Sequence, residues 1–133
     1  MSKERAVGTE WENRVLGHLA PDFPGVHRLP FSSPPGDLGG VLDGLVIECK
    51  SWKRIDIATW VKQAKASAAR IGEHAIAAVV AKRINHPVGK AYVIMELDDW
   101  MTLISQLSHM LPSELGLAPD IKMKLDNPYR VDL

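Results

Sequence analysis

Two short apolar runs, at residues 38–42 and 45–49, are separated only by Asp43-Gly44. Asp-Gly between apolar runs is a strong hairpin signal, because a type I′ turn needs positive φ at both of its central residues. We therefore predict two antiparallel strands in which the residue before Asp43 lies opposite the residue after Gly44. This hairpin determines which side chains share a face of the sheet, so it constrains the fold more than any other feature.

The segments around the hairpin alternate between helical and strand-like periodicity. They predict an α/β fold in the order α-β-β-β-α-β-β-α, with a mixed central sheet flanked by helices. Three helices are expected: one that begins at a Thr9–Glu12 capping box and ends before Pro21 and Pro24, one over 57–71 between Asp56 and Gly72, and one capped by Asp98. The further strands are expected at 26–31, at 75–81, where a continuous apolar run indicates a buried strand, and at 91–97.

The length and composition indicate one globular domain. The chain has 133 residues, which suits a single domain, with a core over about residues 6–110 and a C-terminal tail at 111–133 that offers a dimer contact. A lone Cys49 forms no internal disulfide, and no apolar run approaches the roughly 20 residues that span a bilayer. The N-terminus has no secretory signal, so we expect a cytoplasmic protein without a membrane partner.

Charge is distributed unevenly along the chain. Sixteen basic residues balance sixteen acidic ones, so global basicity gives no argument for a nucleic-acid partner. Residues 50–90, however, hold nine Lys and Arg against two acidic residues. A local basic footprint of this kind is typical of a phosphate-binding surface, and the alternative is a solvated face whose acidic partners come from the flanks.

The predicted hairpin brings three charged side chains to one face of the sheet. With the two-residue turn, Gly39 lies opposite Glu48 and Asp37 lies opposite Lys50. Opposed residues, and residues two apart along a strand, share a face. Two carboxylates and an ammonium therefore converge, whereas Cys49 points to the other face as a small core residue and not as a nucleophile.

Such a cluster suits a hard cation. Two carboxylates, from Asp37 and Glu48, with the backbone carbonyl of Cys49 match the few oxygen ligands that Mg²⁺ takes from proteins, and Mn²⁺ would substitute. Lys50 would orient or deprotonate an attacking water, or neutralise charge on a phosphorane. The alternatives are a simple Asp37–Lys50 ion pair on an exposed hairpin and, under another register, Asp43 as a metal ligand.

The spacing of these residues resembles a known family. Pro35-Gly36-Asp37, ten further residues and Glu48-Cys49-Lys50 resemble the motif of PD-(D/E)XK nucleases. The resemblance implies a restriction-endonuclease-like core, with Asp37, Glu48 and Lys50 as catalytic residues. Several branches of that family place a glutamine beside the site, and Gln63 matches it.

The first predicted helix carries a second resemblance. Gly8-Thr9-Glu10-Trp11-Glu12 resembles the first motif of archaeal-type Holliday junction resolvases, and residues 47–56 resemble resolvase-like nucleases of bacteriophages. The resemblance implies that Glu12 is catalytic and a further metal ligand. Glu10 is the rival, and the spacing from the glycine favours Glu12.

Together these resemblances imply a Mg²⁺-dependent endonuclease that cuts DNA and acts as a homodimer. Its role would be in DNA recombination or repair, and its location would be the host cytoplasm if the chain comes from a phage. We expect a Holliday junction resolvase; the alternatives are a restriction or repair nuclease and a non-cleaving DNA-binding module. Trp52 would stack on a base or pack in the core. The residues expected along the DNA are Lys53, Arg54, Lys62, Lys65 and Arg70.

Overall fold

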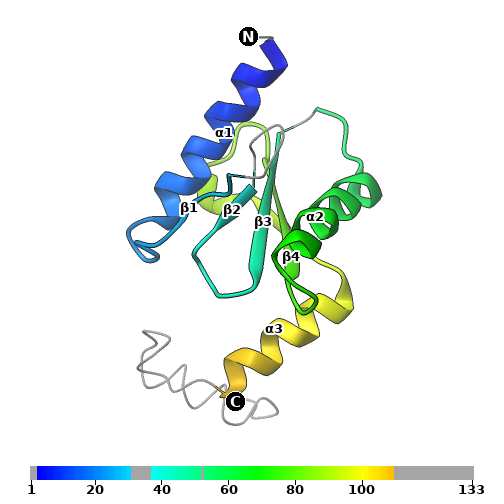
Figure 1. The fold of residues 1–133 in the computed structure, drawn as a ribbon. Helices are drawn as coiled ribbons and strands as arrows, with labels where there is room; N and C mark the ends of the chain where they lie inside the picture. Colours follow the sequence, from blue (N-terminus) through cyan, green and yellow to red (C-terminus); the bar gives the residue numbers. More distant parts are fainter. Residues whose placement is uncertain (1–2, 31–36, 52, 110–133) are drawn as a thin grey trace, which may run out of the picture. The chain divides into compact units, whose positions relative to one another are not determined.

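The structure is a computed structural model that describes residues 3–30, 37–51 and 53–109. The chain divides into two compact units, Met1–Glu96 and Leu97–Leu133. The described part of the first unit contains two α-helices, a short 3-10 helix and a five-stranded sheet (Figure 1). Its elements are α1 (Lys3–Leu19), β1 (His27–Arg28), β2 (Asp37–Gly39), β3 (Leu45–Lys50), α2 (Ile57–Ile71), β4 (Ile76–Ala81), the 3-10 helix η1 (Val88–Lys90) and β5 (Tyr92–Ile94).

The described part of the second unit is the helix α3 (Leu97–His109). Asp98 was expected to cap this helix, but the helix begins one residue earlier and Asp98 lies in its first turn. The carbonyl of Asp98 accepts a hydrogen bond from the Thr102 hydroxyl at 3.0 Å. The tail at 111–133 lies outside the described residues, and the prediction of one domain over 1–133 stays a prediction. None of the helices in the described ranges is long and apolar enough to cross a membrane.

The α/β class and the predicted order of elements are confirmed. The strands are arranged β1-β2-β3-β4-β5, and all neighbours are antiparallel except β3 and β4, which are parallel. The crossover that parallel neighbours require is supplied by the helix α2, which connects β3 to β4. The sheet is therefore mixed, as predicted, and open.

The predicted register of the hairpin is wrong by two residues. Asp37 lies opposite Glu48, and Leu38 lies opposite Ile47. A turn does form at Asp43-Gly44, where the Leu45 N–H donates to the Leu42 carbonyl at 3.1 Å. Its geometry differs from type I′, because the structure gives positive φ to Gly44 (79°) and not to Asp43.

The turn geometry explains the register. A turn with positive φ only at its second central residue is neither type I′ nor type II′, the two types whose twist matches the strands, so the ladder does not continue to the turn. The pairing runs outward from Leu38 and Ile47, and Gly40, at φ 85°, redirects the chain into a wider connection. Because the shift is an even number of residues, Asp37, Glu48 and Lys50 still share one face.

The core fills both faces of the sheet. On one face, Trp60, Ala64 and Ala68 of α2 pack against Val46 and Val79. The residues that alternate with these in the strands are buried on the opposite face: Leu38, Leu45, Ile47, Ile76 and Ala78. Helix α1 contacts β3, and we place its buried Trp11 and Val15 on that second face.

The ends of the two helices were predicted with unequal success. Asp56 caps α2, its side chain accepting from the Thr59 N–H at 3.2 Å, and Gly72 ends the helix, both as predicted. The Thr9 cap is wrong, because α1 begins six residues earlier, at Lys3. The segment before Thr9 is rich in residues that favour helices, and Thr9 lies inside the helix.

Candidate functional site

The hairpin register places two carboxylates directly opposite each other. Asp37 begins β2 and pairs with Glu48 near the end of β3. Side chains at such opposed positions have Cβ atoms about 4.5–5.5 Å apart, which is within reach of a shared cation. Asp37 is only 2% exposed, and the Glu48 side chain is 13% exposed, so both acidic groups lie in a largely dry setting.

Lys50 joins this pair from two residues further along β3. Its Nζ lies 3.2 Å from Glu48 Oε1 and donates to Gln63 Oε1 at 2.5 Å. Burial lowers the pKa of the Lys50 ammonium, and the nearby Asp37 carboxylate opposes this effect. Glu48 thus lies within ion-pair distance of Lys50, and Asp37 acts on the ammonium through its charge.

Gln63 reaches the site because of its position on α2. It lies one turn after the buried Trp60 and one residue before the buried Ala64, so its exposed side chain flanks the helix face that packs on the sheet. The structure therefore brings together four of the predicted catalytic residues: Asp37, Glu48, Lys50 and Gln63.

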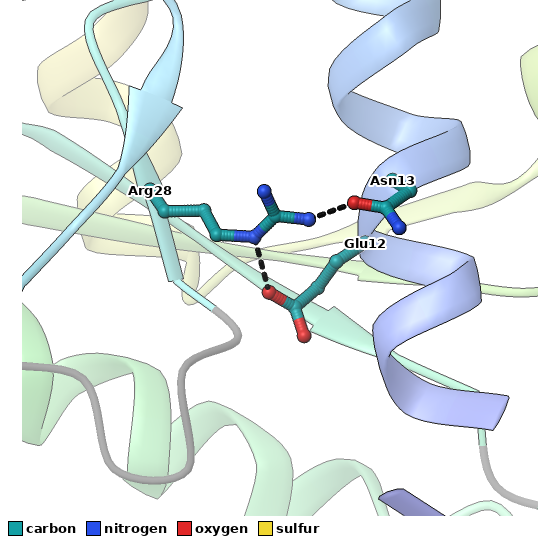
Figure 2. Close-up of polar contacts among 3 residues, drawn as sticks. All are labelled: Glu12, Asn13 and Arg28. Carbon is teal, nitrogen blue, oxygen red and sulfur yellow. Dashed lines mark hydrogen bonds and ion pairs between the residues drawn. The ribbon is translucent and has the colours of Figure 1, made fainter. Parts of the chain in front are cut away.

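The fifth predicted residue, Glu12, has its own basic partner. Figure 2 shows the Arg28 guanidinium, from β1, reaching both Glu12 and Asn13 of α1. Arg28 Nε lies 3.3 Å from Glu12 Oε1, and a second guanidinium nitrogen donates to Asn13 Oδ1. The Glu12 side chain is 6% exposed, and its other carboxylate oxygen points away from the guanidinium (Figure 2).

Glu12 is also linked electrostatically to the hairpin. Burial raises the pKa of the Glu12 carboxyl; Arg28 opposes this rise, and the negative charge of Asp37 adds to it. The same acidic neighbours, Glu12 and Asp37, add to the burial that raises the pKa of the Cys49 thiol to about 12. Cys49 is therefore protonated at neutral pH, which agrees with its exclusion as a nucleophile.

The carboxylate pair fits a magnesium ion. Mg²⁺ prefers oxygen ligands and is bound through one or two carboxylates while it keeps several waters. Asp37 and Glu48, opposed across the hairpin, supply that number. Groups of three or more His, Cys, Asp or Glu side chains arranged to hold a metal are absent from the described ranges.

The residues expected along the DNA are more dispersed. Lys53, Arg54 and Lys62 are exposed, and Arg70 is exposed in the last turn of α2. Lys65 lies 3.0 Å from Glu96 and is thus partly neutralised. Trp52, and the Pro35-Gly36 part of the motif, lie outside the described residues.

Arg28 and Asn13 were missed in the sequence. Arg28 is the only Lys or Arg between Arg14 and Lys50, and it falls in a predicted strand. A lone guanidinium in a strand next to an acidic helix is a signal for a buried carboxylate partner, since buried charges are paired. In the structure Arg28 pairs with Glu12, whereas Glu10 is exposed.

We expect Glu12 to make the stability of the protein depend on pH. Its folded-state pKa lies above the ordinary 4.5, so the folded protein holds this proton more tightly than the unfolded chain. The free energy of unfolding should therefore fall as the pH rises from 4.5 through the raised pKa. Glu12→Gln removes the titrating group and should flatten this slope, as measured by urea unfolding in EDTA at successive pH values.

The matched control is Glu10→Gln, an identical change at an exposed position of the same helix. It should leave the pH slope of the parent in place. A slope that persists in Glu12→Gln would assign the effect to another group. At neutral pH, replacing the buried charge should change stability by no more than about 1 kcal/mol, because Gln keeps an acceptor for Arg28.

We compared the chain with protein-family models, with curated proteins and with solved structures, and none of them matches it.

Proposed function

We propose that the protein is a Mg²⁺-dependent endonuclease that hydrolyses phosphodiester bonds in DNA. The observation that carries this proposal is the Asp37–Glu48 pair with the Lys50 ammonium held beside it. A module that only bound DNA would gain nothing from two carboxylates facing a polyanion, because without a cation they repel phosphate.

Each residue of the site has a role in this proposal. Asp37 and Glu48 hold the metal, with the backbone carbonyl of Cys49 as a further ligand. The bound ion supplies charge stabilisation at a phosphoryl oxygen and a more acidic water. Lys50 orients the water that attacks phosphorus in line with the departing ester oxygen, and Gln63 positions Lys50 through the 2.5 Å hydrogen bond.

The narrower proposal is a Holliday junction resolvase on a restriction-endonuclease-like core. Its supports are the sequence resemblance, the antiparallel β1-β2-β3 arrangement followed by the α2 crossover to β4, and a buried acidic residue on α1. Glu12 corresponds to the helix acid of that resemblance. A resolvase of this type acts as a homodimer, because two opposed strands must be cut.

The test is cleavage of labelled four-way junction, linear duplex and flap DNA by the full chain, in Mg²⁺ and in EDTA. Paired symmetric cuts confined to the junction would support the resolvase. Cuts in every substrate would support a general nuclease. Both outcomes require that activity disappear in EDTA and fall by on the order of 10³-fold or more in Glu48→Gln, which keeps the size of the side chain but removes a metal ligand.

DNA binding without any cutting, in Mg²⁺ or Mn²⁺, would contradict the proposal. The Glu12–Arg28 and Glu48–Lys50 ion pairs would then be structural, and the protein would be a binding module. In that case Glu48→Gln should bind DNA as well as the parent or more tightly, because it removes a negative charge that faces phosphate.

A further inference from the structure

The segment between β4 and β5 is a basic surface next to the candidate site. Residues 82–92 contain Lys82, Arg83 and Lys90 and no acidic residue. The segment starts beside the end of β3, where the Lys82 N–H donates to the Lys50 carbonyl at 2.8 Å. The backbone of Lys82 therefore lies one strand away from Lys50, the catalytic lysine of the proposed nuclease, while the Lys82 side chain lies over Trp11 on the other face of the sheet.

Helix α1 adds a fourth cation to this surface. Arg14 and Lys82 both lie over the ring of Trp11, at 5.7 Å and 6.0 Å from its centroid. One turn further along α1, the ring of His18 lies against Gly89 of η1, where an added Cβ would be 3.2 Å from Nε2. The chain after β4, lime-coloured in Figure 1, is thus held against α1.

The segment is also ordered by contacts within itself. The Arg83 guanidinium stacks on the ring of Tyr92, 4.5 Å from its centroid, and donates to the Lys90 carbonyl at 3.4 Å. Tyr92 remains 57% exposed. A guanidinium stacked on an aromatic ring keeps free edges for a phosphate, because stacking uses its face and hydrogen bonds use its edge.

Three other basic residues near the site have acidic partners, which the described residues do not supply to these cations. Arg28, Lys50 and Lys65 each form an ion pair with a glutamate. Within the described ranges, no carboxylate forms an ion pair with the basic loop surface, which we define as Arg14, Lys82, Arg83 and Lys90. Clustered cations without counter-charges give a positive potential that attracts a polyanion.

We propose that the basic loop surface binds the phosphate backbone of DNA and leads it into the candidate site. This inference takes its ligand from the proposed function. The sequence-based prediction put the DNA along residues 52–54 and along Lys62, Lys65 and Arg70 of α2. The present inference adds α1 and the β4–β5 connection to that contact surface. The shared Trp11 ring and the stacked Tyr92 hold the cations in place before DNA arrives, which reduces the entropy cost of binding.

The test compares two charge-matched variants of the full chain. One carries Lys82→Gln, Arg83→Gln and Lys90→Gln; the other carries Lys62→Gln, Lys65→Gln and Arg70→Gln on α2. Binding of fluorescent duplex and four-way junction DNA is measured by anisotropy in EDTA, where a metal-dependent nuclease does not cut, over about 50–200 mM salt. Each phosphate contact contributes about 0.9 to the slope of log affinity against log salt.

The loop variant should bind on the order of 10-fold or more weakly at about 100 mM salt, and its slope should fall by about 3. The α2 variant should lose less in both quantities. Lys90→Gln alone should lower the slope by about 1. This single variant is a control for misfolding of the triple variant, because the Lys90 side chain is exposed and makes no polar contact with the described residues.

Two results would overturn the inference: an unchanged slope in both the loop variant and Lys90→Gln, or a larger loss in the α2 variant. A parent protein that binds no DNA would overturn it as well. Its failure is separable from that of the nuclease proposal. If the parent cuts DNA and the loop variant keeps the parental salt slope, only the inference about the basic loop surface is contradicted. If binding depends on the loop but the parent cuts no DNA, only the nuclease proposal is contradicted.

Discussion

If the protein is the proposed nuclease, Lys50→Met should lower the kcat/KM of Mg²⁺-dependent DNA cleavage by on the order of 10³-fold or more, because it removes the ammonium held against Glu48 in the candidate site. Met has a similar length and fills the same space without a charge. The Lys50 side chain is only 15% exposed, so water does not readily replace the ammonium. A thermal melt of the variant distinguishes a loss of chemistry from a loss of folded protein.

Gln63→Leu should have a smaller effect on cleavage, because Gln63 acts through Lys50. Loss of the 2.5 Å hydrogen bond should cost about 10- to 100-fold in kcat/KM. Because that bond favours the charged ammonium, its removal should also move the alkaline limb of the pH–rate profile to lower pH. A merely structural glutamine would leave that limb where it is in the parent.

The control for this pair is Gln106→Leu, the same change at an exposed position of α3, which should behave as the parent. In the Lys50→Met background, Gln63→Leu should cause no further loss. A further loss there would mean that Gln63 contacts the substrate directly. Cleavage by Lys50→Met at the parental rate would contradict the role proposed for Lys50.

The periodicity of the sequence was sufficient to predict the elements that carry their own boundary signals. Helix α2 begins after Asp56 and ends before Gly72 as predicted, since a side-chain cap and a terminal glycine are local features. Strand β4 was predicted from a continuous apolar run, which is typical of a strand buried on both faces. The shared face of Asp37, Glu48 and Lys50 followed from the period of two, which an even shift of register preserves.

The missed features depend on contacts between distant residues. The hairpin register depends on the φ angles of Gly40 and Gly44 and on β1, which pairs with the other edge of β2. The pairing of Glu12 with Arg28 joins residues that are 16 positions apart, on different elements. No local pattern encodes these contacts, so the partner of Glu12 was not predicted.

Gly40→Ala should destabilise the protein by about 3 kcal/mol, the second large effect that we expect. Gly40 has a φ of 85°, which a residue with a Cβ adopts only with strain. An added Cβ would also overlap the Gly25 carbonyl, with the carbonyl carbon at 2.7 Å, and would lie 2.9 Å from His27 Nδ1. The obstacle on the Gly25 side is backbone, so the strand β1 or β2 must move.

Gly44→Ala is the matched control, because Gly44 has a similar φ of 79° but open space where its Cβ would be. It should cost only the strain of the left-handed conformation, about 1–2 kcal/mol. Urea unfolding measures the stability of both variants, and equal losses would contradict the close approach of Gly40 to Gly25.

Because a displaced β2 carries Asp37 away from Glu48, the nuclease proposal adds a second consequence. Gly40→Ala should cut DNA about 100-fold more slowly even where it is fully folded, whereas Gly44→Ala should retain its activity.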